Sequence, residues 1–279
     1  MWGNKRGSDN EVKNTTVARQ GSILIFVLWI LAMLAYLAGD YLAHNRERAA
    51  VCSNSWNVEK ENQAINSVIE LFSADRSPLS GQEEENGWIA LSPGGVKLWV
   101  RLEKEAHRVN VNSAPDSEIR KKIVEVTADE SEDKADQLSD AILDWRDPDK
   151  LTRQNGAEAG YYRDQGLPYV PGDGPFKALT ELLLVRGMNS GLFWGNPLAS
   201  VNAQTQQDKE SGDRPLSVSD AFTVFDADVK RLTVVVPGRG KSYELALVFM
   251  KKKGVRWQAF QVYRTTLVSD GKEDKFGDQ

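Results

Sequence analysis

The sequence has few of the side chains that build redox, zinc or nucleophilic centres. Its single cysteine, Cys52, excludes a disulfide within the chain, although an oxidising compartment is still permitted. Its two histidines, His44 and His107, stand too far apart in the sequence to suggest a zinc cluster or a Cys-His nucleophile. No nucleophile, base and orienting group come together along the chain, so we do not expect an enzyme.

A surplus of positive charge is also missing. The 35 lysines and arginines are outnumbered by 40 aspartates and glutamates, which gives a net charge of -5 at pH 7. Residues 112–115 (Asn-Ser-Ala-Pro) are similar to the start of a helix-hairpin-helix DNA-binding module. However, the acidic segment 127–133 replaces the glycine-rich hairpin that such a module needs. An excess of negative charge disfavours binding to the phosphate backbone of a nucleic acid, so no nucleic-acid partner is predicted.

Charged residues are absent altogether from residues 22–39. A helix over this apolar run would span roughly 27 Å, close to the thickness of a bilayer core of about 30 Å. Residues 40–69 then continue without a proline and with recurring apolar positions, which favours an unbroken helix. We therefore predict a transmembrane and stalk helix over residues 22–75.

The polar stretch before this run, residues 1–21, ends in a glycine. A secretory signal peptide would carry its small-residue cleavage site after the apolar core, whereas here Gly21 precedes it. A basic leader, a glycine and an uncharged helix that extends into a stalk together resemble type IV pilins and type II secretion pseudopilins. The resemblance implies that a prepilin peptidase cuts between Gly21 and Ser22. The alternative is an ordinary uncleaved signal anchor.

One carboxylate typical of that class is missing. Most members carry a glutamate at the fifth position of the mature helix, where it pairs with the amine of a neighbouring subunit. Counted from Ser22, this position is Phe26. A subunit without the carboxylate cannot form this pair with a subunit ahead of it, and unpaired charge in lipid is costly. The absence is typical of the K-type minor pseudopilin and implies a place at the filament tip.

Residues 76–112 are predicted to form the first part of an antiparallel sheet. After a polar linker over residues 73–86, apolar and polar side chains alternate, as in a strand with one buried face. We expect this strand to pair as a two-stranded ribbon with the segment that contains Val109 and Val111. The pilin class lays such a sheet against its stalk helix. The apolar positions of the strand are Val96, Leu98, Val100 and Leu102.

Residues 113–195 change to helical spacing and are predicted to be an inserted all-helical subdomain. A first helix starts near Pro115, which suits a first turn. A second helix follows the acidic stretch 128–134, and a third ends at Gly187. The apolar stripe of the second helix is Ala135, Leu138, Ala141, Ile142 and Trp145, and that of the third is Phe176, Leu179, Leu182 and Leu183.

Residues 196–268 are predicted to be a loop followed by C-terminal strands. The polar segment 203–215 is the loop, and residues 232–236 and 242–249 form a hairpin about the turn at 237–240. A further strand carries Val255, Trp257, Phe260, Val262 and Tyr263. Residues 269–279 form a polar tail.

The most specific motif outside the helix is Asp-Trp-Arg-Asp-Pro-Asp at residues 144–149, followed by Gly-Ala-Glu at residues 156–158. It strongly resembles the signature of the K-type pseudopilin, and this resemblance implies a structural calcium ion held by Asp147, Asp149 and Glu158. Asp144 is a weaker candidate. Closely spaced carboxylates on a proline-containing loop suit a hard cation that takes oxygen ligands. The alternative is that the aspartates cap turns while Glu158 pairs with Arg153 or Arg163.

The resemblance implies an α+β fold: a pilin-like N-terminal transmembrane and stalk helix packed on an antiparallel β-sheet, with a large inserted all-helical subdomain. It implies a non-enzymatic subunit at the tip of the periplasmic pseudopilus that serves protein secretion across the outer membrane. Expected partners are the I- and J-type minor pseudopilins, the prepilin peptidase and the inner-membrane assembly platform. The chain would cross the inner membrane once, with its N-terminus cytoplasmic and its C-terminal domain periplasmic. The competing hypothesis is a type IV pilus minor pilin or an adhesin-like, membrane-anchored binding module.

Overall fold

The computed structural model describes residues 14–74, 87–128, 131–198, 201, 216–238 and 242–268. The chain divides into two compact units, Met1–Lys60 and Glu61–Gln279. Our expectations for the start of the leader, for the linker after residue 74, for the loop 203–215 and for the tail 269–279 lie outside the described residues.

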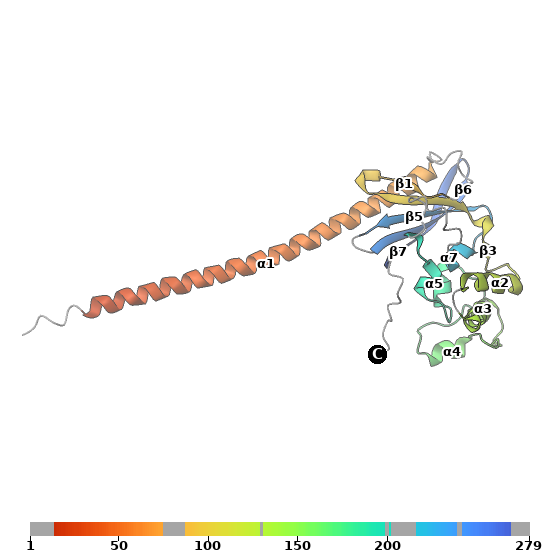
Figure 1. Cartoon of the computed structure of the whole chain (residues 1–279), viewed down its shortest axis with the longest axis horizontal. Helices are drawn as coiled ribbons and strands as arrows, with labels where there is room; N and C mark the ends of the chain where they lie inside the picture. The colour runs from red at the N-terminus through yellow and green to blue at the C-terminus, as the bar shows by residue number, and fades with distance from the viewer. Residues whose placement is uncertain are drawn as a thin grey trace, which may run out of the picture. The chain divides into compact units, whose positions relative to one another are not determined.

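The described part of the first unit is a single helix. Helix α1 (Asn14–Ser73) runs through this unit without a break and continues into the second (Figure 1). Its apolar stretch has a mean hydropathy of 2.3, and none of that stretch is buried within the structure. A long helix that exposes apolar side chains on every side suits lipid rather than water. The predicted continuity of the apolar segment with the stalk is confirmed.

The second unit is built on a five-stranded antiparallel sheet with the order β1-β2-β5-β6-β7. The strands are β1 (Ile89–Leu91), β2 (Leu98–Lys104), β5 (Val229–Pro237), β6 (Ser242–Lys253) and β7 (Arg256–Val268). The short helix η1 (Pro93–Gly95) joins β1 to β2. The expected C-terminal hairpin is confirmed as β5 and β6, and the further strand as β7.

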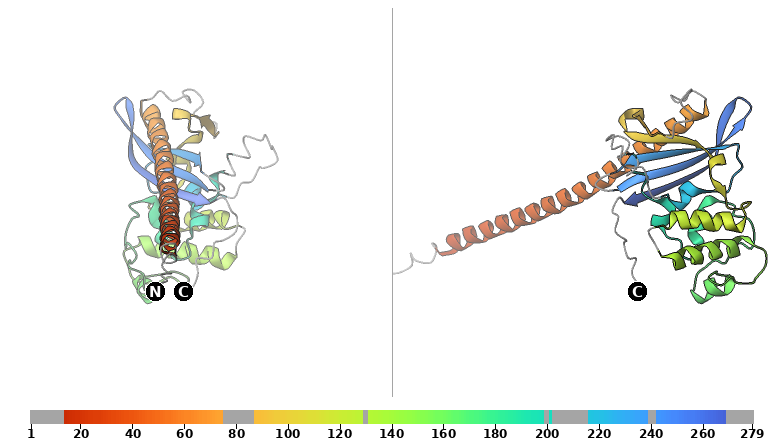
Figure 2. Two further views of the ribbon diagram at one scale, coloured as in Figure 1. Left: turned by 90° about the vertical axis from the view of Figure 1, so that its left-hand side faces the viewer. Right: turned by 45° about the vertical axis from the view of Figure 1, so that its right-hand side comes forward.

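Both faces of this sheet are buried, so it forms the middle layer of the unit (Figure 2). Alternate residues of β6 point to opposite faces because the side-chain period of a strand is two. Ala246, Val248 and Met250 pack with the last turns of α1. On the other face, β6 packs with the helical part of the unit. The α1 residues in the first contact are Ala64, Ile65, Val68 and Phe72, and the β6 residues in the second are Tyr243, Leu245, Leu247 and Phe249.

The predicted ribbon between β2 and the segment at Val109 is wrong. The helix η2 (Glu105–His107) redirects the chain after β2, whose partners are β1 and β5. Strand β3 (Val109–Asn110) instead pairs in parallel with β4 (Phe222–Thr223) in a separate two-stranded sheet. The inward alternation of β2 is nevertheless confirmed, because Leu98 and Val100 are fully buried.

The helical elements cluster on one face of the sheet and share one core. They are α2 (Asp116–Val126), α3 (Glu132–Arg146), α4 (Ala159–Asp164), η3 (Leu179–Leu184), α5 (Ser190–Trp194) and α7 (Val218–Ala221). The predicted apolar stripe of α3 is buried throughout. The third expected helix is the 3-10 helix η3, in which Leu179 and Leu182 share one side because its period is three residues. Gly187 closes this segment with a left-handed φ of 85°.

Candidate functional site

The structure brings together the three carboxylates that the sequence singled out. Asp147 follows directly after α3, and Glu158 directly precedes α4, so the loop between the two helices carries all three groups. One ligand oxygen of each of Asp147, Asp149 and Glu158 lies within 4.8 Å of the others. Such an oxygen cluster is of the right size and chemistry to surround a hard divalent cation.

Two oxygens in this cluster are buried without a hydrogen-bond partner among the described residues. They are Oδ1 of Asp147 and Oε1 of Glu158. Glu158 is only 7% exposed, so its carboxylate has lost most of its hydration. A buried polar atom without a partner destabilises a fold by roughly 1–3 kcal/mol. A cation between these oxygens would satisfy both of them, so the residues fit the calcium ion that the resemblance implies.

The electrostatics of Glu158 agree with this geometry. Burial is the largest cause that raises the pKa of this carboxyl group, and the charges of Asp144, Asp173 and Asp147 raise the pKa further. Asp173 did not stand out in the sequence. It lies between two glycines and has a left-handed φ of 44°, a conformation that aspartate tolerates better than most residues. The Gly-Asp-Gly sequence is the signal that could have drawn attention to it.

Asp144 is fully buried, and its carboxylate is paired with Arg153. Its Oδ1 accepts a hydrogen bond from Nη1 of Arg153 at 2.8 Å, and its Oδ2 accepts one from the backbone N–H of Arg153 at 3.2 Å. Nη1 of Arg153 also contacts Asp147. These carboxylates raise the pKa of the Arg153 guanidinium, although its burial acts in the opposite direction. Arg153 therefore neutralises one side of the cluster and leaves the side that faces Glu158 electronegative.

The alternative, in which Glu158 pairs with Arg153 or Arg163, is not found among the described residues. Arg153 bonds Asp144 and Asp147, and Nε of Arg163 donates to the carbonyl of Ala159 at 3.1 Å. The turn-capping role that the same alternative gave to the aspartates is found for Asp149. Its Oδ1 accepts a hydrogen bond from the backbone N–H of Leu151 at 2.7 Å, as in an aspartate-stabilised turn. The turn fixes one oxygen of Asp149 and leaves the carboxylate exposed.

The loop is held against the helices at Gly156. A Cβ atom on this residue would lie 1.9 Å from Oδ2 of Asp144, so only glycine allows the backbone to pass. The carbonyl of Gly156 accepts a hydrogen bond from Nη1 of Arg186 at 2.8 Å. Below the loop, Trp145 packs edge-on against Tyr162 and is stacked on Phe176. These three rings belong to the core that the helical elements share.

A second polar cluster, which sequence reasoning missed, joins the sheet to the helical elements. Its centre is a buried ion pair between Arg231 of β5 and Glu105 of η2, with Nε and Oε1 separated by 2.7 Å. Arg231 also donates to the carbonyls of Ser219 and Phe222. Both side chains of the ion pair are at most 1% exposed. Residues 126 positions apart cannot be paired from one sequence, so no local signal announces this contact.

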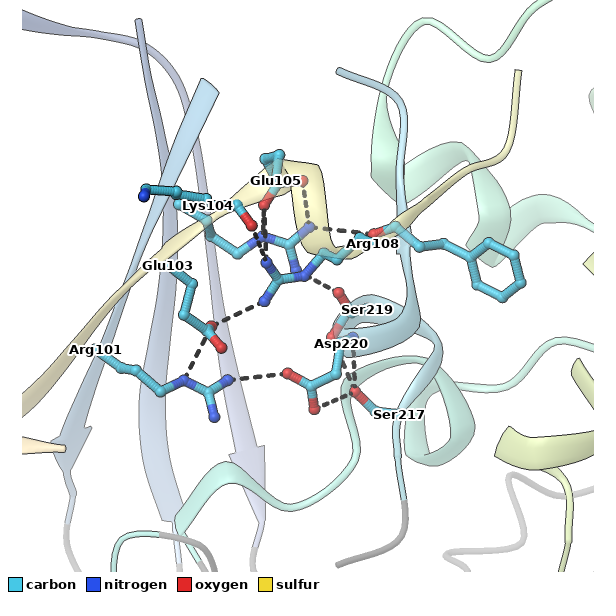
Figure 3. Close-up of polar contacts among 10 residues, drawn as sticks. Arg101, Glu103, Lys104, Glu105, Arg108, Ser217, Ser219 and Asp220 are labelled. Atoms are coloured by element: carbon cyan, nitrogen blue, oxygen red, sulfur yellow. Dashed lines mark hydrogen bonds and ion pairs between the residues drawn. The ribbon is translucent and has the colours of Figure 1, made fainter. Parts of the chain in front are cut away.

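Further ion pairs extend this cluster from the sheet to the helical elements (Figure 3). Arg108 bridges Glu103 and Glu105, with 2.8 Å between its Nη2 and Oε2 of Glu103. Arg101 contacts Glu103 from the other side and reaches Asp220 of α7 at 3.0 Å. With Arg231, the three arginines match three carboxylates in charge. The balanced set lets the sheet bury polar residues beneath the helices.

The processing residues Gly21 and Ser22 lie within α1, but their side chains are outside the described set. From Ile23 onward, the described helix includes one stretch that is long and apolar enough to cross a membrane. In the sequence, the expected cleavage point directly precedes the apolar run 22–39, and cleavage there stays a prediction.

The helical region is similar to known proteins. Residues 108–193 match the family model described as the first domain of type II secretion system (T2SS) protein K. A type II secretion system protein K from Klebsiella pneumoniae is 39% identical over 57 residues, which are 20% of this chain and 18% of that protein. The matched segment thus spans less than a fifth of that relative.

One solved structure aligns with much of the chain. A chain in the crystal structure of the GspK-GspI-GspJ complex from enterotoxigenic Escherichia coli aligns with 80% of this chain and 99% of its own length. The TM-score is 0.41 and the sequence identity is 11%, a level from which nothing about function follows. The family model match covers residues 108–193, and these residues contain the carboxylate cluster. This part of the chain is similar to the type II secretion system protein K family.

Proposed function

We propose that this chain is a minor pseudopilin of a type II secretion system, a non-enzymatic structural subunit that serves protein secretion across the outer membrane. One observation carries this proposal: a protein K domain occurs in the same chain as an apolar N-terminal helix long enough to span a membrane. A purely soluble binding protein would have no use for an 18-residue window of this hydropathy outside its core.

The membrane helix also suggests where the subunit acts. In the proposed arrangement, the N-terminus is cytoplasmic, the apolar part of α1 lies in the inner membrane and the second unit lies in the periplasm. A prepilin peptidase would cut between Gly21 and Ser22, and the assembly platform would then lift the helix out of the membrane. Phe26 stands at the fifth mature position and cannot pair with the amine of a neighbouring subunit. We therefore place the subunit at the tip, where no subunit lies ahead whose amine would need a carboxylate partner.

The proposed partners are I- and J-type minor pseudopilins in a tip complex. Helix α1 offers small residues within its apolar stretch, at Ala32, Ala35 and Ala38, which allow neighbouring helices to approach closely. Co-expression of the full chain with the two other pseudopilins in detergent tests this directly. We expect a ternary complex that survives size-exclusion chromatography, whereas a monomer under all conditions would contradict the proposed partnership.

We further propose that Asp147, Asp149 and Glu158 hold a structural calcium ion. The unpartnered buried oxygens of Asp147 and Glu158 support this assignment. Bound calcium would neutralise the cluster and tie the end of α3 to the start of α4. Isothermal titration of the full chain in detergent should give a calcium heat and a raised melting temperature. No heat and an unchanged melting temperature would remove the calcium site without affecting the proposed role in secretion.

Loss of the gene tests the function as a whole. We expect a deletion strain to retain its secreted proteins in the periplasm and to regain secretion when the full-length gene is restored. Secretion that is indifferent to the deletion would contradict the proposed function.

A further inference from the structure

The hairpin of β6 and β7 projects beyond the rest of the sheet (Figure 2). Pairing with β5 reaches no further than Lys251, which lies opposite Val229. Beyond that point, Lys252 and Lys253 pair only with β7. The turn that follows carries Val255, which is 85% exposed. The end of this hairpin therefore projects from the sheet, and packing of the hydrophobic core does not explain this projection.

A hollow of about 430 Å³ lies beside this projection. This volume is within the range of sites that accept a small molecule or a few residues of a peptide, roughly 300–1,000 Å³. Its apolar lining comes from the segment after β4, from the start of β5 and from β7. The lining residues are Val224, Phe225, Val229 and Phe260, together with Asp226, Gln258 and the three lysines 251–253.

Aromatic side chains line the hollow because of an irregularity in β7. Phe249 lies opposite Gln261 and Met250 lies opposite Ala259, so the intervening Phe260 forms a β-bulge. Bulges re-aim a side chain away from the regular alternation. Phe260 is 49% exposed and meets Phe225 edge-on, with ring centroids 5.3 Å apart. An exposed aromatic pair of this kind offers a surface for an apolar side chain.

The polar side of the hollow is strongly basic. Lys251 forms an ion pair with Asp228 at 3.2 Å and is 4.0 Å from Asp226. Within the part of the chain that the structure describes, Lys252 and Lys253 have no ion pair. Arg256 adds a further positive charge at the hairpin end. This excess is local, because the chain as a whole has a net charge of -5. Unmatched cations next to an apolar hollow favour an anionic ligand with an apolar part.

We propose that this hollow docks an acidic, extended segment of a partner protein that packs one apolar side chain against Phe225 and Phe260. The carboxylates would face Lys252 and Lys253, and the apolar side chain would cover the aromatic pair. A lipid surface fits less well, because the carboxylates of Asp226 and Asp228 flank the apolar part of the hollow. The inference does not depend on the proposed role in secretion.

Fluorescence anisotropy with the full chain in detergent tests this proposal. The probe is a labelled peptide of about eight glutamates around one central phenylalanine, long enough to cross the hollow as an extended strand. We expect Lys252→Glu combined with Lys253→Glu to weaken binding at least about tenfold, since charge complementarity is reversed. Phe260→Ala should weaken binding about tenfold through lost apolar contact. Matched controls on α2, Lys121→Glu and Val124→Ala, should bind as the wild type does.

Three outcomes would overturn the proposal. The first is equal binding by the wild type and by the Lys252 and Phe260 variants. The second is equal binding of a peptide with glutamine in place of glutamate, which would indicate general stickiness. The third is full competition by glycerol phosphate together with no loss when the peptide phenylalanine becomes alanine, which would indicate a site for anionic headgroups. Because Phe260 and the lysines are exposed, circular dichroism can verify that each variant remains folded.

Discussion

At the scale of single residues, Glu158 has the most to gain from a bound cation. Its carboxylate is buried, and its pKa is raised by burial and by the neighbouring aspartates. A carboxyl group whose pKa is higher in the folded chain than in the unfolded chain favours folding at low pH. This contribution is lost as the pH rises through the pKa of the folded state. Without calcium, the ionised group therefore destabilises the fold.

We predict that Glu158→Gln stabilises the protein in a chelator at neutral pH, by about 1 kcal/mol, because the buried negative charge is removed. The difference from the wild type should shrink as the pH falls below the pKa of Glu158 in the folded chain. Calcium should stabilise the wild type and leave the variant almost unchanged. Urea unfolding over a pH series, with calcium and with chelator, measures all three effects. Asp164→Asn, an exposed change on α4, is the matched control. Parallel pH profiles for Glu158→Gln and the wild type would contradict this prediction.

Gly156 offers a second test at this scale. We predict that Gly156→Ala destabilises the protein by about 2 kcal/mol or more, because the new Cβ would collide with Asp144 and overpack the loop. Gly160→Ala is the matched control, since no atom lies within 4 Å of its added Cβ. Its place in α4 should make the control slightly stabilising, by roughly 0.5–1 kcal/mol. Equal melting temperatures for the two variants would show that the loop does not depend on this close approach.

The sequence was informative about these residues only to a point. Asp147, Asp149 and Glu158 could be named because their motif resembles the signature of the K-type pseudopilin, and because closely spaced carboxylates on a proline-containing loop suit a hard cation. The partners of Arg153 could not, because Asp144 and Asp147 compete with Glu158 for the same guanidinium and only the fold decides between them. Asp173, whose charge raises the pKa of Glu158, has a left-handed backbone conformation that amino-acid composition does not reveal.

At the scale of elements, alternation in the sequence predicted the strands but not all of their partners. The β5–β6 hairpin is local and was predicted correctly. One of the two partners of β2 is β5, more than 100 residues away, and no local pattern selects it. Polar residues such as Arg101 also suggest a solvated face. That face is buried because ion pairs with Glu103 and Asp220 neutralise it beneath the helices.

The Arg231–Glu105 pair provides a prediction about the boundary between sheet and helices. Arg231→Met or Glu105→Gln alone should cost about 3–5 kcal/mol, because each leaves a buried group without its partner. The double variant should cost clearly less than the sum of the single changes, since neither unmatched charge remains. Urea denaturation of the four proteins gives this double-mutant cycle. If the cost of the double variant equals the sum of the two single costs, the ion pair does not couple the sheet to the helices.

At the scale of the whole molecule, a helix that is long and apolar enough to cross a membrane occurs in the same chain as a region that matches the protein K family model. Processing at Gly21 is the step that would convert the anchored chain into an assembly-competent subunit. We predict that Gly21→Leu blocks cleavage, because a side chain obstructs the close backbone approach that glycine allows. N-terminal sequencing of the membrane-purified chain measures this. Gly39→Ala in the same helix, where the added Cβ meets no atom within 4 Å, should be processed normally. A Gly21→Leu chain that still begins at Ser22 would refute the prediction.

The position of the subunit in the filament tests the central claim most directly. Pseudopili assembled from tagged full-length chains can be labelled with gold against the head and viewed by electron microscopy. A subunit with Phe26 in place of the usual carboxylate should appear once, at one end of each filament. Label distributed evenly along the shaft would contradict the account.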